Sequence, residues 1–234
     1  MKHKKKILIT GGSRGLGLAL AKRYDELGAD VSVTARDASQ LASALEGTNI
    51  RGIVSDISEK RSIYPLAARV VDDMGGLDIL INNAGYLGVT PLRLLADTDC
   101  EDLNALWTTN VLGPFRLIKA LLPTLEKSPE GLVVNISSDA AVSAYETWGG
   151  YSISKAALDH MTRLFQQEHK RTSLKFIAVD PGDMLTDMYR AAIPDADTSQ
   201  LRRPEQVADE LERFLSQQAF PEIRCGSQQW RELL

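Results

Sequence analysis

The stretch ILITGGSRGLGLALAKRY, residues 7–24, passes from an apolar run through four glycines into an amphipathic pattern. This order predicts a strand, a tight turn and a helix. Glycines let the backbone turn sharply and approach a ligand closely, and the first free N–H groups of a helix attract an anion. Gly11, Gly12, Gly15 and Gly17 therefore indicate a pyrophosphate-binding turn. Their spacing, GxxxGxG, differs from the common GxGxxG fingerprint, so a purely structural turn stays an alternative.

Short β-branched runs and segments with helical periodicity alternate along the rest of the chain. The runs lie at residues 7–10, 30–35, 50–55, 77–82, 132–137 and 174–179, with room for a further strand at 223–225. The helical segments lie around residues 15–28, 37–46, 58–74, 97–122, 149–171 and 203–217. Parallel strands need crossover connections, which are usually helices. The alternation predicts one α/β domain, residues 1–234, with a doubly wound, mostly parallel sheet of about seven strands and helices on both faces.

Single residues mark several boundaries of these segments. Asp37 and Ser58 stand where helix N-caps belong, and Pro204 stands near a first helical position. Pro65 lies inside the third helical segment and predicts a kink or a later helix start. Residues 182–203 have little periodicity, which is typical of a functional loop. We therefore expect residues 183–203 to form a lid over a substrate.

The composition is that of an ordinary globular protein and excludes several function classes. Hydrophobic residues make up 44% and charged residues 25% of the 234 residues, and the net charge of -4 argues against a nucleic-acid partner. No apolar run approaches the ~20 residues of a membrane helix, and the chain does not open on a signal-peptide pattern. We therefore expect a cytoplasmic protein without a membrane partner. Cys100 and Cys225 lack a CxxC or Cys/His neighbourhood, so the sequence predicts no disulfide framework and no metal site.

Tyr151 and Lys155 form the most informative pair in the sequence. They are four residues apart and share one face of the predicted helix 149–171. A Lys155 ammonium near the phenol stabilises the phenolate and is expected to lower the pKa of Tyr151 from about 10 toward neutral pH. Such a phenol can give a proton to an alkoxide or take one from an alcohol. Ser138, at a predicted strand end, can hydrogen-bond a substrate oxygen. Each residue alone is more typical of an ordinary helix face or strand end.

The motifs TGGSRGLG, NNAG, TTNVLG, YSISK and PG occur together, with Asp56 and Ser138, in an order that resembles the short-chain dehydrogenase/reductase family over about residues 5–218. The resemblance implies a Rossmann-type fold and an oxidoreductase that transfers hydride between a nicotinamide cofactor and a carbonyl compound or alcohol. It implies that Tyr151 is the acid–base group, that Ser138 orients the substrate and that Lys155 also holds the nicotinamide ribose. It further implies that Asn110 supports a water that relays protons.

The resemblance also implies a set of cofactor contacts. In that set Asp56 accepts a hydrogen bond from the adenine amino group, and the Ile57 N–H completes the contact. The whole set is Gly11, Ser13, Arg14, Gly15, Leu16, Gly17, Arg36, Asp56, Ile57, Asn83, Ala84, Gly85, Tyr151, Lys155, Pro181, Gly182 and Thr186.

The end of the second predicted strand favours NADP(H) over NAD(H). An NAD-selective site commonly places a carboxylate there, which would repel a 2′-phosphate. This chain has Ala35 at that point, followed by Arg36, and Arg14 in the glycine loop offers a second guanidinium. Asp37 could contact the ribose, or it could cap the following helix. The sequence leaves both roles open.

The substrate is expected to be a small, neutral, largely apolar ketone or aldehyde. Residues between Ser138 and Tyr151 and in the lid supply aromatic and flexible apolar side chains, the usual lining of a small-molecule pocket. The predicted pocket residues are Leu87, Tyr145, Trp148, Met184 and Met188. Arg190 is the basic residue of the first part of the lid that could bind a substrate carboxylate.

Two further expectations concern alternatives and assembly. A noncatalytic NADP(H)-binding sensor is the alternative function, although such a protein would have lost the tyrosine or the serine. A methyltransferase would have no use for Tyr151 and Lys155. Helices around residues 97–122 and 149–171 could pair with a second copy, and the C-terminal AFPEIRCGSQQWRELL lacks the glycine-rich strand that builds tetramers in the resembling family. We therefore expect a homodimer, and the sequence leaves tetramer formation open.

Overall fold

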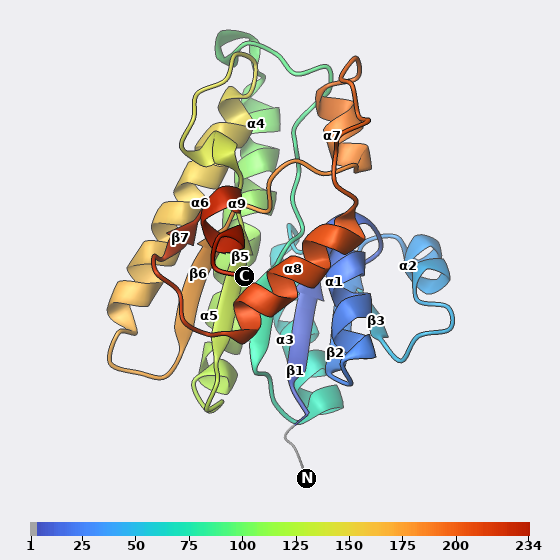
Figure 1. Cartoon of the computed structure of the whole chain (residues 1–234), viewed down its shortest axis with the longest axis vertical. Helices are drawn as coiled ribbons and strands as arrows, with labels where there is room; N and C mark the ends of the chain where they lie inside the picture. Colours follow the sequence, from blue (N-terminus) through green and yellow to red (C-terminus); the bar gives the residue numbers. More distant parts are fainter. Residues whose placement is uncertain (1–3) are drawn as a thin grey trace.

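Seven parallel strands form one sheet in the part of the chain that this computed structural model describes, residues 4–234 (Figure 1). Residues 1–3 of the expected domain lie outside the described residues. The strands are β1 (Lys6–Thr10), β2 (Asp30–Ala35), β3 (Arg51–Val54), β4 (Ile79–Asn82), β5 (Leu132–Ile136), β6 (Lys175–Val179) and β7 (Arg224–Cys225). Their order is β3-β2-β1-β4-β5-β6-β7, so the strand order reverses between β1 and β4. The predicted doubly wound fold is confirmed, and ligands of such folds bind at the carboxyl ends beside that reversal.

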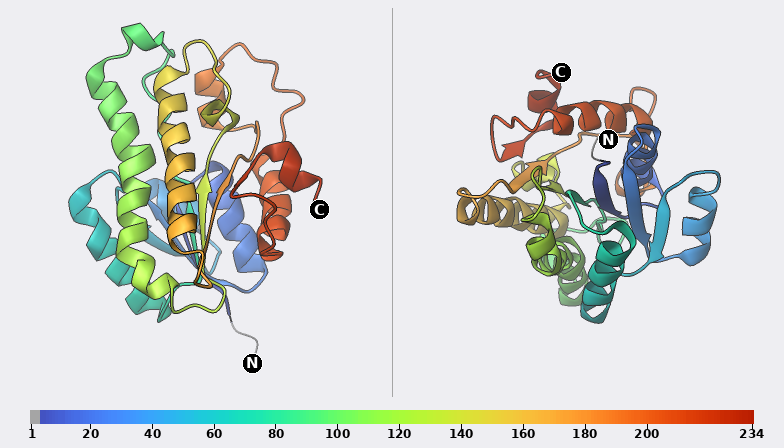
Figure 2. Two further views of the ribbon diagram at one scale, coloured as in Figure 1. Left: turned by 90° about the vertical axis from the view of Figure 1, so that its left-hand side faces the viewer. Right: turned by 90° about the horizontal axis from the view of Figure 1, so that it is seen from below.

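Helices cover both faces of the sheet (Figure 2). They are α1 (Gly15–Glu26), α2 (Ala38–Ala44), α3 (Lys60–Met74), α4 (Cys100–Trp107), α5 (Gly113–Leu125), α6 (Gly149–Glu168), α7 (Asp187–Ala192), α8 (Pro204–Ser216) and α9 (Ser227–Arg231). Along β1, Ile7 and Ile9 pack against the layer of α1 and α8, whereas Leu8 packs against the layer of α3 and α5. Both faces of the strand are therefore apolar, as expected for a parallel sheet between two helical layers.

The predicted helix 97–122 is interrupted where a functional side chain lies. Between α4 and α5 the backbone widens into a π-helical turn, Thr108–Leu112, which contains Asn110. Pro114 follows four residues after Asn110 and has no N–H, so the Asn110 carbonyl cannot receive its regular α-helical hydrogen bond. Such π-helical turns are frequent at functional sites.

The predicted helix starts are partly correct. Asp37 caps α2, because its carboxylate accepts the Gln40 N–H at 2.9 Å, and Pro204 is the first residue of α8. The expected cap at Ser58 is wrong: its hydroxyl donates to Asp56 Oδ1 at 2.7 Å, and α3 begins only at Lys60. A later start at Pro65 is also wrong, since α3 runs through it. One proline removes a single backbone hydrogen bond, and the buried face of the helix outweighs that loss.

The lid segment, residues 183–203, is more ordered than its sequence suggests. It contains α7, whose N-cap Thr186 accepts the Tyr189 N–H at 3.2 Å. A parallel bridge pairs Met184 with Arg202, so the two ends of the lid lie side by side. None of the helices in residues 4–234 is both long and apolar enough to cross a membrane.

Candidate active site

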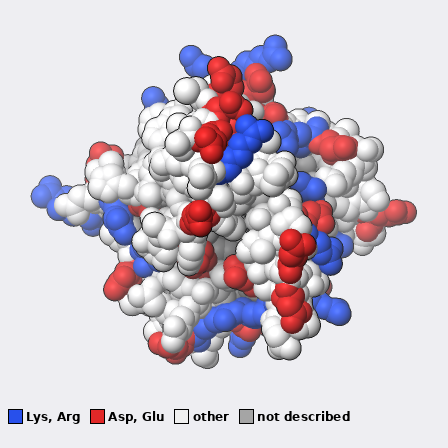
Figure 3. All heavy atoms as spheres, turned by 90° about the horizontal axis from the view of Figure 1, so that it is seen from above, with Lys and Arg blue, Asp and Glu red and all other residues white. Residues whose placement is uncertain are grey.

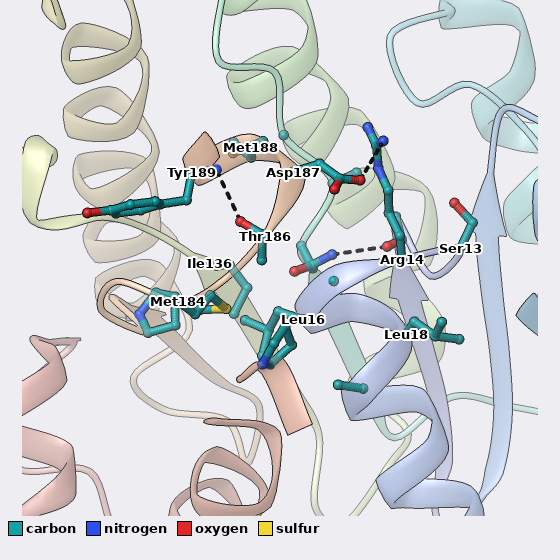
Figure 4. Close-up of a pocket in the computed structure, with 18 of the residues that line it drawn as sticks. Ser13, Arg14, Leu16, Leu18, Ile136, Met184, Thr186, Asp187, Met188 and Tyr189 are labelled. Atoms are coloured by element: carbon teal, nitrogen blue, oxygen red, sulfur yellow. Dashed lines mark hydrogen bonds and ion pairs between the residues drawn. The ribbon is translucent and has the colours of Figure 1, made fainter. Parts of the chain in front are cut away.

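A cavity of about 910 Å³ opens at the carboxyl ends of the strands. Seen from above, this end of the molecule is hollowed near its centre, with acidic and basic side chains around the hollow (Figure 3). The glycine loop and α1 form one wall, and the lid segment forms another (Figure 4). The predicted cofactor residues that line the cavity are Gly11, Ser13, Arg14, Gly15, Leu16, Arg36, Asp56, Ile57, Asn83, Ala84, Gly85, Tyr151, Lys155, Pro181, Gly182 and Thr186. One crevice thus gathers segments from nearly the whole chain.

The glycine loop needs its glycines for two different reasons. Gly11 lines the cavity with φ +72°, and a Cβ there would lie 2.9 Å from Ala84 Cα. Gly17 does not line the cavity, so its predicted cofactor contact is not supported. A Cβ on Gly17 would lie 2.3 Å from the Gly11 carbonyl oxygen, which shows that this glycine lets α1 pack beneath the loop. Gly12 also lies outside the lining and packs closely on Val33.

Hydrogen bonds between the ends of β1 and β4 hold this loop in place. The Asn83 and Ala84 N–H groups both donate to Thr10 Oγ1 at 3.0 Å. Asn83 Nδ2 donates to the Thr10 carbonyl at 3.0 Å and to the Gly11 carbonyl at 3.3 Å. The NNAG motif therefore fixes the backbone on both sides of the strand reversal.

Two arginines, Arg14 and Arg36, line another part of the cavity, and β2 itself ends in Ala35 and not in a carboxylate. Ala35 ends β2, and the Arg36 guanidinium lies 3.9 Å from the Asp56 carboxylate. Arg14 reaches across to Asp187 of α7 at 3.4 Å (Figure 4). The Gln40 N–H lowers the pKa of Asp37, whose carboxylate is engaged as the cap of α2. The capping role is thus observed in the structure.

Tyr151 and Lys155 lie at the inner end of the cavity on one face of α6. Lys155 Nζ is 5.5 Å from the centre of the Tyr151 ring and donates to the Ile136 carbonyl at 2.7 Å. Ser138 follows β5, and its Oγ accepts the Ala140 N–H at 3.2 Å and donates to Asp139 at 3.0 Å. The structure therefore brings Ser138, Tyr151 and Lys155 together, as the sequence predicts.

The protonation of this pair differs from the expectation. Burial raises the pKa of Tyr151 above its ordinary value, and a hydrogen bond with Ser138 offsets this only in part. The expected lowering of the Tyr151 pKa by Lys155 is therefore wrong. The main cause is the burial of Tyr151 itself, because its phenolate would lie away from water. Burial also lowers the pKa of Lys155 to about 8, although the charges of Asp159 and Asp180 favour its protonated form. Tyr151 is a protonated phenol at neutral pH.

Asn110 lies behind the cavity, not in its lining. Its side chain is fully engaged: Nδ2 donates to the Tyr86 carbonyl at 2.8 Å and to Ser154 Oγ at 2.9 Å, while Oδ1 accepts the Tyr86 N–H at 2.8 Å. These bonds tie the segment after β4 to α6. The sequence gives no sign of Ser154, because its role depends on a contact between distant elements.

Four of the five predicted pocket residues line the cavity. Leu87, Trp148, Met184 and Met188 line it, and the Trp148 ring packs edge-on against Tyr151 at 5.8 Å. The prediction for Tyr145 is not supported, because this side chain lies outside the lining. Its hydroxyl donates to Asp139 at 2.7 Å, and its ring packs on Trp148 from outside.

Two carboxylates near the catalytic group were missed from the sequence. Asp139 and Asp183 both line the cavity, and burial together with the charge of Asp139 raises the pKa of Asp183. Asp139 directly follows Ser138, so its place at the site could have been inferred. Asp183 is the first residue of the lid segment, where the sequence pattern does not show which way a side chain points. Arg190, the proposed carboxylate partner, is exposed and lies outside the lining.

Comparisons with known proteins agree with this geometry. A family model described as short chain dehydrogenase matches residues 5–197. L-fucose dehydrogenase of Mus musculus is 31% identical over 79% of this chain and 67% of its own. The 3-oxoacyl-[acyl-carrier-protein] reductase FabG of Vibrio cholerae is also 31% identical, over 83% of this chain and 79% of its own. A protein of Escherichia coli CFT073 solved in complex with NADPH superimposes with a TM-score of 0.85 at 27% identity, covering 96% of each chain.

The family match covers most of the chain, and the matching region contains Ser138, Tyr151 and Lys155 at the end of a cavity lined by the glycine loop. The chain is an oxidoreductase that belongs to the short-chain dehydrogenase family.

Proposed function

We propose that this oxidoreductase transfers hydride between NADPH and a small, neutral ketone or aldehyde. The observation that carries the proposal is the arrangement of one cavity, with Ser138, Tyr151 and Lys155 at its inner end and Arg14 and Arg36 at the other. The acid–base phenol at one end suits a carbonyl group. The two guanidiniums at the other end suit the phosphates of a dinucleotide.

The residues present fit a nicotinamide dinucleotide. Gly11 and Gly15 bring the backbone to the cavity wall without side chains, and the N-terminus of α1 has no side-chain cap. Its free N–H groups and helix dipole favour a pyrophosphate. The guanidiniums of Arg14 and Arg36 favour a 2′-phosphate, and the NADPH in the Escherichia coli relative agrees with that choice. When bound, the cofactor would supply or accept the hydride.

The chain's own groups handle the proton and hold the substrate oxygen. The Ser138 hydroxyl would bind the carbonyl oxygen beside the phenol. Tyr151 would donate its Oη proton to that oxygen as the carbonyl becomes an alcohol, and solvent would return the proton. The raised pKa of Tyr151 keeps this proton in place at neutral pH. A protonated Lys155 would stabilise the phenolate left after the transfer.

The charges around the cavity support a neutral substrate. Among the described lining residues, the basic side chains other than Lys155 come from the glycine loop, α1, the end of β2 and the start of α8: Arg14, Lys22, Arg23, Arg36 and Arg203. Asp139 and Asp183 lie on the substrate side, where they would repel a carboxylate. Trp148 and Met184 provide apolar contacts there.

Homodimer formation is part of the proposal. Exposed apolar side chains occur along α4, α5 and α6, namely Trp107 (40% exposed), Phe115 (37%), Ile153 (43%) and Leu164 (50%). Large apolar groups on neighbouring helices are a frequent feature of protein interfaces. Sedimentation velocity would test this assembly directly.

The activity is tested with purified protein, NADPH and a panel of ketones, aldehydes, quinones and sugars. The proposal expects NADPH oxidation with neutral carbonyl compounds and its loss in Tyr151→Phe. Tight NADPH binding without turnover of any member of the panel would favour a noncatalytic NADP(H) sensor instead.

A further inference from the structure

A buried ion pair joins the C-terminal strand to the helix that carries Tyr151 and Lys155. Arg224 Nε of β7 donates to Asp159 Oδ2 of α6 at 2.7 Å, and the two side chains are 12% and 4% exposed. Removing both charges from water is costly, so a buried pair of this kind is weak support for stability by itself. The groups around the Arg224–Asp159 pair indicate a role in positioning the site.

Arg224 contacts the turn that carries Ser138, and the charge of Asp159 acts on Lys155. Arg224 Nη2 donates to the main-chain carbonyl of Ser138 at 3.0 Å. Asp159 lies one helical turn after Lys155, so the two side chains share a face of α6. A single guanidinium therefore links the turn that carries Ser138 to the helix that carries Tyr151 and Lys155. Its planar fork binds two acceptors in fixed directions, which a lysine cannot do.

The segment that starts with β7 also holds the loop after β6, residues 180–182, which lines the cavity. The Asp180 N–H donates to the Cys225 carbonyl at 3.0 Å, and Trp230 Nε1 donates to the Asp180 carbonyl at 2.8 Å. Trp230 is fully buried, and a Cβ on Gly182 would lie 2.9 Å from Ser227 Cβ. The C-terminal residues 224–230 thus pack beneath two loops that line the cavity.

We infer that Arg224 is a positioning residue, which holds the Ser138 turn against α6 through Asp159 so that the Ser138 hydroxyl stays aligned with Tyr151. Arg224 and Asp159 do not line the cavity, so neither contacts substrate or cofactor. Asp159 and Asp180 are the carboxylates that face Lys155, and Arg224 also faces Asp180. Loss of the guanidinium therefore changes the geometry of the site without removing a group that contacts the dinucleotide.

The test is a double-mutant cycle between Arg224 and Ser138 in carbonyl reduction, the activity on which this readout rests. Arg224→Met paired with Asp159→Leu removes both charges together, so no lone buried charge remains. We expect kcat to fall about 10-fold to 100-fold from misalignment. In a Ser138→Ala background the same pair of changes should cost no further kcat. Arg224→Lys, with Asp159 retained, should recover less than half of the kcat that the Arg224→Met/Asp159→Leu variant loses.

Hydrogen exchange gives a readout that does not depend on turnover. The Ala140 N–H donates to Asp139 Oδ1 at 2.8 Å and to Ser138 Oγ at 3.2 Å, and both acceptors belong to the turn that Arg224 holds. Its exchange should therefore accelerate in the Arg224→Met/Asp159→Leu variant, while amides of β5 stay protected. Arg51→Met, which breaks the Arg51–Asp30 pair at the far edge of the sheet, is the matched control and should change neither readout. Additive losses of kcat with Ser138→Ala, or unchanged exchange at Ala140, would overturn the inference. A wild-type protein without turnover would contradict the proposed function, and the exchange data would still decide the role of Arg224.

Discussion

Arg36→Ala is the sharpest test of the proposed NADP(H) preference. The side chain is 74% exposed at the mouth of the cavity and lies 3.9 Å from the Asp56 carboxylate. Its removal leaves the cap of α2 in place, because Asp37 makes that contact with Gln40. The substitution therefore removes one cation from the cavity without disturbing the strand or the helix on either side.

The size of the effect follows from this exposure. A hydrogen bond to a charged group contributes about 1.5–3 kcal/mol. Arg36 is exposed and already faces Asp56, so the lower end of that range applies, about 1.5 kcal/mol or roughly 10-fold in affinity. We expect kcat/KM for NADPH to fall about 10-fold and kcat/KM for NADH to stay unchanged. Arg14→Ala should act similarly, and the double variant should lose about 100-fold if the two sites are independent.

Initial rates with both cofactors at one carbonyl substrate measure the selectivity. Arg61→Ala is the control, since Arg61 is 91% exposed on α3 and pairs with Glu59 away from the cavity. Its cofactor preference should match the wild type. Equal kcat/KM values for NADH and NADPH in the wild type, or an undiminished NADPH preference in Arg36→Ala, would refute the assignment of the 2′-phosphate to this arginine.

Three further outcomes are expected from the same site. Tyr151→Phe removes only the phenolic oxygen, so kcat should fall by about 10²–10⁴ with NADPH binding retained, and near-normal turnover would exclude Tyr151 as the proton donor. The pKa of Lys155 is lowered to about 8 in the free protein, so NADPH affinity should be constant below that pH and decline above it; a titration that stays flat across pH 7–9, or a decline that persists in Lys155→Met, would contradict this. For carbonyl pairs differing by one carboxylate, the wild type should prefer the neutral member, and Asp139→Asn and Asp183→Asn should each narrow that preference about 5-fold, since unit charges 4 Å apart in water interact by about 1 kcal/mol. A wild type that prefers the carboxylate would overturn the neutral-substrate proposal.

The fold could be predicted because local pattern and global architecture agree along most of the chain. A strand with two apolar faces, such as β1, requires helices on both sides, and the alternating segments supply them. The exceptions arise where a single residue changes the backbone. The π-helical turn around Asn110 depends on Pro114, whose effect on a carbonyl four residues earlier is not visible in hydrophobic periodicity.

The candidate site was predictable to the extent that a parallel sheet collects strand ends. Gly11, Asn83 and Ser138 follow three neighbouring strands, so the topology places them at one edge. Arg224 reaches Ser138 across 86 residues through a side-chain contact, which no local pattern encodes. Asp139 is the intermediate case: its position was known, whereas its orientation toward the cavity needed the structure.

The protonation of Tyr151 shows most clearly why the site could not be derived from its motif alone. The spacing of Tyr151 and Lys155 identifies a cation near a phenol, and charge alone would lower the pKa of the phenol. Burial opposes this effect of charge, because it disfavours both the phenolate and the ammonium. It raises the pKa of Tyr151 and lowers the pKa of Lys155. Tyr151 is therefore a protonated phenol at neutral pH, the form that donates a proton in the proposed carbonyl reduction.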